Sequence, residues 1–209
     1  MATSIPQMQV LTREELQRFL IQAKDEGYYE LFLLELGTGM RRGEILALQW
    51  NDLNFNNGEL NIKRQLYAVK GELHISTPKT KSSVRTVVLP TSLINILAEY
   101  QKTVNSKWIF PSPLDNTVTR NPSAVRQRLQ LILERADCKR VRFHDLRHTF
   151  STMALEHGMD IKTLSATIGH VSAATTLDIY LYKREQCSHY TIRSIQCRLG
   201  FRTNAEIPF

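Results

Sequence analysis

A short region of two-residue periodicity, flanked on both sides by helical periodicity, constrains the fold of this chain more than any other feature. The segments 59–63, 72–76 and 85–89 alternate between polar and apolar residues or are rich in β-branched ones. Turn-forming residues separate them at 70–71 and 79–83. The pattern predicts a small three-stranded antiparallel sheet.

The segments on either side of this region carry helix signals. Thr12 and Glu15 have the spacing of a capping box, and the helix that they begin is predicted to end near Gly27. A second, more buried helix is predicted over 28–36, and Pro122 suits the first position of a later one. The predicted fold class is therefore α+β and mostly α-helical.

Length, cysteines and apolar runs narrow the class of protein. The 209 residues, 42% of them hydrophobic, suffice for one domain, or for one domain with an appendage. The three cysteines form no C-x-x-C pair, which indicates a reducing compartment such as the cytoplasm. The longest apolar run, 28–36, contains Glu30 and Glu35 and is too short to span a bilayer, and no signal peptide is visible. We expect a cytoplasmic protein with no membrane partner.

The charge is positive and unevenly distributed. Lys and Arg number 27 against 20 Asp and Glu, a net charge of +7, which favours polyanionic partners without separating nucleic acid from an acidic membrane surface. Residues 120–148 hold eight basic and three acidic residues. Such clustering is typical of contact with a phosphate backbone, and a solvated helix face is the alternative. The eight basic residues are Arg120, Arg126, Arg128, Arg135, Lys139, Arg140, Arg142 and Arg147.

The stretch 138–182 gathers four residues that belong to one chemistry. It contains His144, Arg147, His170 and Tyr180. A lone histidine or tyrosine is more often structural than catalytic. Together, however, two imidazoles, a guanidinium and a phenol predict a phosphoryl-transfer site with a tyrosine nucleophile and no metal.

Two further segments carry candidate site residues. Residues 38–44 place two glycines around Arg41 and Arg42 at a helix start, which suits an anion, and Glu44 is expected to orient one arginine by a charge-assisted hydrogen bond. The predicted turn at 79–83 presents two lysines that could reach into a groove and lend a proton. Solvated arginines on a loop and ordinary edge-strand lysines are the alternatives.

These motifs together resemble the tyrosine recombinases of the phage integrase family, and within it the integrases of conjugative transposons. The resemblance is carried by T-G-M-R at 38–41, H-D-L-R at 144–147, G-H at 169–170 and the tyrosine ten residues later. It covers 11–180 in order and in spacing. It implies a helical catalytic domain over 11–182, preceded by a leader at 1–10 and followed by a tail of uncertain structure at 183–209.

The resemblance also implies a role for each catalytic residue. Tyr180 would attack the scissile phosphate to give a 3′-phosphotyrosine, while Arg41 and Arg147 would bind the non-bridging oxygens. The other expected roles are protonation of the 5′-oxygen by Lys79, acceptance of the tyrosine proton by His144, a hydrogen bond to the phosphate from His170 and support of Arg41 by Glu44.

Double-stranded DNA is the partner that the resemblance implies, with a homo-oligomer, a tetramer, assembled on it. Neither a metal nor another cofactor is expected, because the phosphotyrosine conserves the energy of the broken bond. The residues expected to contact DNA are Arg42, Lys81, Arg120, Arg126, Arg128, Lys139, Arg140 and Arg142.

The sequence departs from the family pattern at both ends. The family usually carries DNA-binding domains before the catalytic domain, and 1–10 has no room for them. After Tyr180 the expected helix that docks on a neighbouring subunit is replaced by a tail with little apolar periodicity, which weakens the expectation of cooperative assembly. Tyr182 and Tyr190 are rival nucleophiles with less suitable spacing.

The function predicted is site-specific DNA strand exchange, for the integration and excision of a mobile element. A truncated, non-catalytic DNA-binding remnant that modulates a full-length integrase is the main alternative. A topoisomerase-like relaxing enzyme with the same nucleophile is a third.

Overall fold

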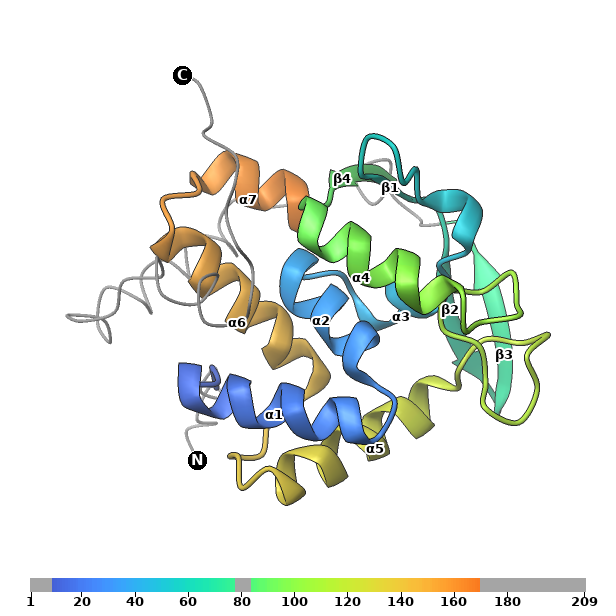
Figure 1. Cartoon of the computed structure of the whole chain (residues 1–209), viewed down its shortest axis with the longest axis horizontal. Helices are drawn as coiled ribbons and strands as arrows, with labels where there is room; N and C mark the ends of the chain where they lie inside the picture. The colour runs from blue at the N-terminus through green and yellow to red at the C-terminus, as the bar shows by residue number, and fades with distance from the viewer. Residues whose placement is uncertain (1–8, 78–83, 170–209) are drawn as a thin grey trace, which may run out of the picture.

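A helical body surrounds one central helix in the computed structural model, and short strands lie along one side of it (Figure 1). The structure describes residues 9–77 and 84–169. The helices are α1 (Arg13–Asp25), α2 (Tyr29–Thr38), α3 (Arg42–Leu46), the 3-10 helix η1 (Trp50–Asp52), α4 (Thr91–Gln101), α5 (Pro122–Arg135), α6 (Phe143–Glu156) and α7 (Ile161–Ile168). The strands are β1 (Glu59–Ile62), β2 (Gln65–Val69), β3 (Glu72–Ser76) and β4 (Arg85–Val88).

Helix α2 is the centre of the core because it is apolar on almost every side. Leu31, Phe32 and Leu34 are fully buried, and α1, α4 and α6 all pack against this helix. The Phe32 ring lies 5.0 Å from that of Phe19 on α1 and 6.2 Å from that of Phe143 on α6, measured between centroids. A helix that is hydrophobic all round must be covered all round, which explains its central place.

Two predicted helix starts are confirmed, whereas the helix predicted over 28–36 extends to Thr38. The Thr12 hydroxyl accepts a hydrogen bond from the backbone N–H of Glu15, and the Glu15 carboxylate accepts one from the N–H of Thr12. Pro122 takes the first position of α5, with Asn121 as its cap. Helix α2 ends at Gly39, whose φ of 60° lies in the left-handed region that glycine tolerates best.

The antiparallel strands are confirmed, but not as one sheet of three. Among the described residues they form two sheets of two, one pairing β1 with β4 and the other pairing β2 with β3. The sequence pattern missed β2 because only Leu66 of this strand is buried, so its alternation is weak. A two-residue turn closes the β2–β3 hairpin, and both Lys70 and Gly71 have positive φ there, as a type I′ turn requires.

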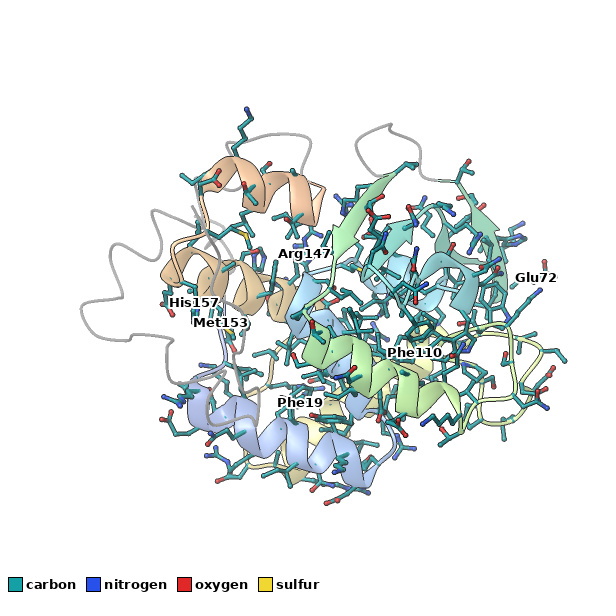
Figure 2. The ribbon with its side chains drawn as sticks, turned by 45° about the horizontal axis from the view of Figure 1, so that its top comes forward. Phe19, Glu72, Phe110, Arg147, Met153 and His157 are labelled. Carbon is teal, nitrogen blue, oxygen red and sulfur yellow. The ribbon has the colours of Figure 1, made fainter. Side chains whose placement is uncertain are left out.

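Burial distinguishes interior from surface side chains. Phe19, Phe110 and Arg147 point into the interior, whereas Glu72 lies at the edge of the hairpin (Figure 2). None of the described helices is both long and apolar enough to cross a membrane.

Gly39 offers a test of how tightly the central helix end is packed. A Cβ atom at this position would overlap the Phe150 ring and lie 3.1 Å from a methyl group of Ile168. We expect Gly39→Ala to combine left-handed backbone strain of about 1–2 kcal/mol with overpacking of about 1–3 kcal/mol in the free energy of unfolding. Urea denaturation measures the sum.

Gly27→Ala is the matched control. Gly27 has a similar φ of 69° and nothing within 4 Å of the added Cβ, so this variant carries the backbone strain alone. Equal losses in the two variants would show that the contact between Gly39 and Phe150 contributes nothing.

Candidate active site

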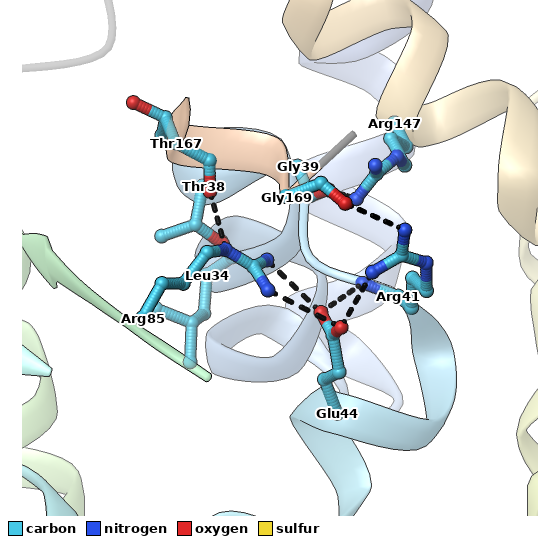
Figure 3. Close-up of polar contacts among 9 residues, drawn as sticks. All are labelled: Leu34, Thr38, Gly39, Arg41, Glu44, Arg85, Arg147, Thr167 and Gly169. Atoms are coloured by element: carbon cyan, nitrogen blue, oxygen red, sulfur yellow. Dashed lines mark hydrogen bonds and ion pairs between the residues drawn. The ribbon is translucent and has the colours of Figure 1, made fainter. Parts of the chain in front are cut away.

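Three arginines from distant parts of the chain converge around one carboxylate (Figure 3). Arg41 directly precedes α3, Arg85 opens β4 and Arg147 lies on α6. The carboxylate is that of Glu44 on α3, which is 1% exposed. Most of this site is therefore assembled by packing rather than by proximity in sequence.

Glu44 holds two of the three arginines. Its oxygens accept hydrogen bonds from Arg41 Nη1 at 2.8 Å, from the Arg41 backbone N–H at 3.0 Å, and from Arg85 Nη1 and Nη2 at 3.2 and 3.0 Å. Burial alone would raise the pKa of this carboxyl, but the hydrogen bonds and charge of Arg85, with the bonds from Arg41, hold the pKa below its ordinary value. Glu44 is therefore ionised at neutral pH, and the expected charge-assisted bond to Arg41 is present.

Arg41 reaches from this carboxylate to the end of α7. Its Nη2 donates to the carbonyl oxygen of Gly169 at 2.8 Å. The side chain keeps 38% of its surface exposed, so the guanidinium is fixed on one side and open to solvent on the other. That arrangement suits an arginine that receives an anion from outside.

Arg147 is buried with much of its hydrogen-bonding capacity unused. Its Nη1 donates to the carbonyl oxygen of Gly39 at 2.7 Å, whereas Nε and Nη2 have no partner among the described residues. Burial, with the nearby charge of Arg41, lowers its pKa to about 10, so the group is still a cation at neutral pH. Buried N–H groups of a cation need acceptors, and an anionic oxygen would supply them.

Glu35 on α2 is a second carboxyl near the arginines, and its protonation state differs from that of Glu44. It is fully buried, and neither of its oxygens has a hydrogen-bond partner among the described residues. Burial raises its pKa well above the ordinary value, although the charge of Arg147 opposes the shift, and the neutral, protonated form is favoured. With Glu35 neutral, three guanidinium groups face one carboxylate, a net charge of +2.

A pair of histidines lies at the start of α6. The rings of His144 and His148 meet edge to face with their centroids 4.6 Å apart. Partial burial, together with the charge of Arg147, lowers the pKa of His144, so its ring is neutral and able to accept a proton at neutral pH. Burial, with the neighbouring His144, lowers the pKa of His148 to about 4 and keeps that ring neutral as well.

Comparison with known proteins is decisive for the family. Residues 9–186 match the phage integrase family. The chain belongs to this family.

Individual relatives in the phage integrase family agree in sequence. The chain is 33% identical over 200 residues to a tyrosine recombinase XerC-like protein of Caldanaerobacter subterraneus, covering 84% of this chain and 51% of that protein. It is 28% identical to the ICEBs1 integrase of Bacillus subtilis, covering 83% and 50%. The chain thus spans about half the length of the curated relatives that it matches.

Solved structures agree in fold. The Tn1549 transposon integrase, in complex with transposon right end DNA, has a TM-score of 0.76 and 22% identity, covering 96% of this chain and 68% of that one. The XerA recombinase has a TM-score of 0.67 and 22% identity, covering 90% and 67%. The fold is that of a tyrosine recombinase catalytic domain.

Four of the seven residues expected in an integrase site are placed by the structure. Arg41, Glu44 and Arg147 lie together, and His144 is close enough for both arginines to influence its pKa. The other three, Lys79, His170 and Tyr180, lie outside the described residues and stay predictions.

Most of the residues expected to contact DNA have intramolecular partners. Arg128 donates to Glu26 at 2.9 Å, joined there by Arg135, which links α5 to the end of α1. The Arg120 guanidinium stacks over the Tyr28 ring at 4.1 Å. Lys139, Arg140 and Arg142 contact Glu15, Gln130 and Asp145, respectively.

The other three residues expected to contact DNA are Arg42, Arg126 and Lys81. Arg126 is exposed. Arg42 is half-buried, and its burial, together with the charge of Arg126, lowers the pKa of Arg42. Lys81 lies outside the described residues. The basic cluster is thus in part an internal network, and its contact with DNA stays a prediction.

The sequence interpretation missed two residues of this site. The sequence pattern predicts Arg85 only as part of a strand, although a basic residue that opens the mostly apolar Thr-Val-Val-Leu run is a signal. For Glu35 the pattern shows only an interruption of an apolar helix. A carboxyl in such a helix must face either solvent or a cation, and the second reading would have pointed to the arginines.

The two carboxyls predict opposite pH effects from the same substitution. Folding raises the pKa of Glu35. Its favourable contribution to the free energy of unfolding is therefore complete below the ordinary pKa of glutamic acid, and it is lost as the pH rises through the pKa of the folded state. Glu35→Gln should remove this loss and leave the free energy of unfolding at pH 7 unchanged or higher.

Glu44→Gln is the matched control, because folding lowers the pKa of Glu44. The contribution of Glu44 to the free energy of unfolding is therefore present above the ordinary pKa of glutamic acid and is lost as the pH falls through the pKa of the folded state. At pH 7 this variant should lose about 3–5 kcal/mol, the usual effect of breaking a buried pair. Chemical denaturation between pH 4 and 8 measures both. A large loss at neutral pH in Glu35→Gln would contradict the neutral form of Glu35.

Proposed function

We propose that this chain is the catalytic domain of a site-specific DNA recombinase. It cleaves and rejoins DNA strands through a 3′-phosphotyrosine intermediate, for the integration and excision of a mobile element. The observation that carries the proposal is the buried Arg147, whose Nε and Nη2 lack partners among the described residues, in a site that also holds Arg41. Membership of the phage integrase family supports it.

The charge of the site fits a phosphodiester in its transition state. The two non-bridging oxygens carry one negative charge in the ground state and more as the nucleophile approaches. Arg41, open on one side, and Arg147, with unused N–H groups, are the two ligands that we assign to these oxygens. The surplus of positive charge is fixed before DNA arrives, so little reorganisation is needed during the reaction.

The reaction that we propose exchanges one phosphodiester for another. The phenolic oxygen of Tyr180 attacks phosphorus, its proton passes to His144, and the bond from phosphorus to the 5′-oxygen breaks. Lys79 delivers a proton to that oxygen, and His170 donates a hydrogen bond to the phosphate. The reverse sequence, with the 5′-hydroxyl of another strand, rejoins the DNA without ATP, because the phosphotyrosine keeps the bond energy.

The low pKa of His144 favours its assignment as proton acceptor. A base must be neutral at the working pH, and burial, together with the charge of Arg147, lowers the pKa of this ring and favours its neutral form. The acceptance of a proton then adds the positive charge of His144 to those of Arg41 and Arg147 while negative charge builds on the phosphate.

Double-stranded DNA is the partner of the proposed reaction, and a homo-oligomer, a tetramer, is the proposed assembly. One structural relative was solved in complex with transposon right end DNA, and another, the lambda integrase, as a dimer bound to a core site. We propose that Arg42 and Arg126 contact the DNA backbone, together with Lys81 and the partly paired residues Arg120, Arg128, Lys139, Arg140 and Arg142. Because the proposed substrate is DNA, we also propose that the protein works in the cytoplasm.

Covalent trapping tests the nucleophile. Incubation with a pool of nicked suicide duplexes of randomised core sequence should give a protein–DNA adduct that survives denaturation. Tyr180→Phe should give none, because the attacking oxygen is absent. The adduct is measured by its slower migration in a denaturing gel.

Tyr182→Phe and Tyr190→Phe are the controls and should both form the adduct. An adduct with Tyr180→Phe would reject Tyr180 as the nucleophile. No adduct with the unsubstituted chain on any duplex would instead indicate a non-catalytic DNA-binding protein.

Arg147 gives a quantitative test of the phosphate site. Arg147→Lys keeps one charge but loses the planar fork, and we expect the single-turnover cleavage rate to fall by about 10²–10³-fold, as for loss of one oxyanion donor. Arg64 contacts Asp52 and Ala47 and none of the three arginines or Glu44 in the described contacts, so Arg64→Lys should change the rate less than about threefold. A rate for Arg147→Lys similar to that of the control would remove Arg147 from the phosphate site.

A further inference from the structure

We propose that Arg85 is a positioning residue for strand cleavage, which holds Arg41 in the orientation that binds the scissile phosphate. The proposal rests on the proposed function, because it assigns a role within the same site. Arg85 lies 44 residues after Arg41 in the sequence, and Glu44 and the end of α7 connect the two side chains.

Each guanidinium nitrogen of Arg85 donates to a protein oxygen. Nη1 and Nη2 donate to the two carboxylate oxygens of Glu44, and Nε donates to the carbonyl oxygen of Thr167 at 2.6 Å. The side chain is only 7% exposed. A guanidinium with all three nitrogens in use, and little of its surface open, is suited to holding the site rather than to binding substrate.

Glu44 transmits this constraint to Arg41. The carboxylate accepts bonds from Arg85 on one side, and from the Nη1 and backbone N–H of Arg41 on the other (Figure 3). Because the oxygens are held by Arg85, the carboxylate cannot rotate to follow Arg41. The half-exposed Arg41 guanidinium therefore has one favoured orientation before DNA binds.

Arg41 and Arg85 also donate hydrogen bonds to backbone carbonyls at the same end of α7. Arg85 binds the Thr167 carbonyl, and Arg41 binds the Gly169 carbonyl two residues later. A Cβ at residue 169 would lie 2.9 Å from Arg85 Nη1, so the absence of a side chain there lets the Arg85 guanidinium approach. Loss of Arg85 would release this helix end and move the carbonyl that orients Arg41.

The consequence for the reaction is a change in rate rather than in binding. Arg85 does not have to touch DNA, so its removal should leave the affinity for DNA nearly unchanged. A misplacement of about 1 Å in a catalytic group can cost about 100-fold in rate. We therefore expect Arg85→Gln to lower the single-turnover cleavage rate by about 10- to 100-fold, with Kd within about threefold of the original.

Arg64→Gln is the matched control for destabilisation. Arg64 lies between β1 and β2, pairs with the buried carboxylate of Asp52 and has its Nε directed at the Ala47 carbonyl oxygen, 3.4 Å away. It thus combines the same two kinds of contact as Arg85, at another place in the fold. Both variants should lower the thermal midpoint, and only Arg85→Gln should lower the cleavage rate at a temperature where all proteins stay folded.

Non-additivity tests whether Arg85 acts through Arg41. The Arg41→Lys variant already lacks the guanidinium group that Arg85 orients. Adding Arg85→Gln to this variant should therefore reduce the cleavage rate less than about twofold further. Full additivity of the two effects would overturn the proposal, as would an equal loss of rate in Arg64→Gln. Arg85→Lys should recover part of the rate at most, since one ammonium group cannot replace the three N–H donors.

A measurement without DNA separates this proposal from the proposed function. The heteronuclear NOE of the Arg41 Nε–Hε group, assigned by its absence in Arg41→Lys, reports motion on the picosecond to nanosecond timescale. It should be that of a rigid group in the unsubstituted chain and in Arg64→Gln, and that of a mobile group in Arg85→Gln. An unchanged signal in Arg85→Gln would overturn the positioning role, whereas a missing adduct with the unsubstituted chain would overturn only the cleavage reaction.

Discussion

The carboxylate of Glu44 is the contact on which the rest of the site depends. It is buried, ionised and shared by Arg41 and Arg85, so it joins the start of α3 to the first residue of β4. Through these arginines it also fixes the end of α7. A single buried negative charge thereby determines the relative placement of segments that come from both ends of the described chain.

The two buried carboxyls give the site its electrostatic character by being in opposite states. Glu44 is ionised because cations donate to both of its oxygens, whereas Glu35 has no hydrogen-bond donor among the described residues and is favoured as the neutral acid. If both were ionised, they would neutralise most of the charge of Arg41, Arg85 and Arg147. With one neutral, a surplus of positive charge stays in place for an anion, at a cost in folding stability that the apolar packing around α2 offsets.

The sequence was sufficient wherever the determining contact was local. The capping box at Thr12, the turn at Lys70 and the pairing of Arg41 with Glu44 each involve residues a few positions apart, and all were predicted. Contacts across the fold were not predictable in this way. Arg85 is held by Glu44, which lies 41 residues away in the sequence. Arg128 and Arg135 were expected to face DNA, but their bonds to Glu26 direct both side chains toward α1. Strand β2 was not predicted because Leu66 is its only buried residue, so the strand has no clear alternation of buried and exposed positions.

The long sequence separations within the site have a consequence for the life of the chain during synthesis. Arg41 contacts the backbone of Gly169, 128 positions later, and Arg147 contacts that of Gly39, 108 positions earlier. A nascent polypeptide on the ribosome, or a degradation fragment that ends before α6, lacks Arg147 and the contacts of α7 with Arg41 and Arg85. The arginine cluster that includes the two proposed phosphate ligands, Arg41 and Arg147, therefore forms only after α6 and α7 have been translated and folded.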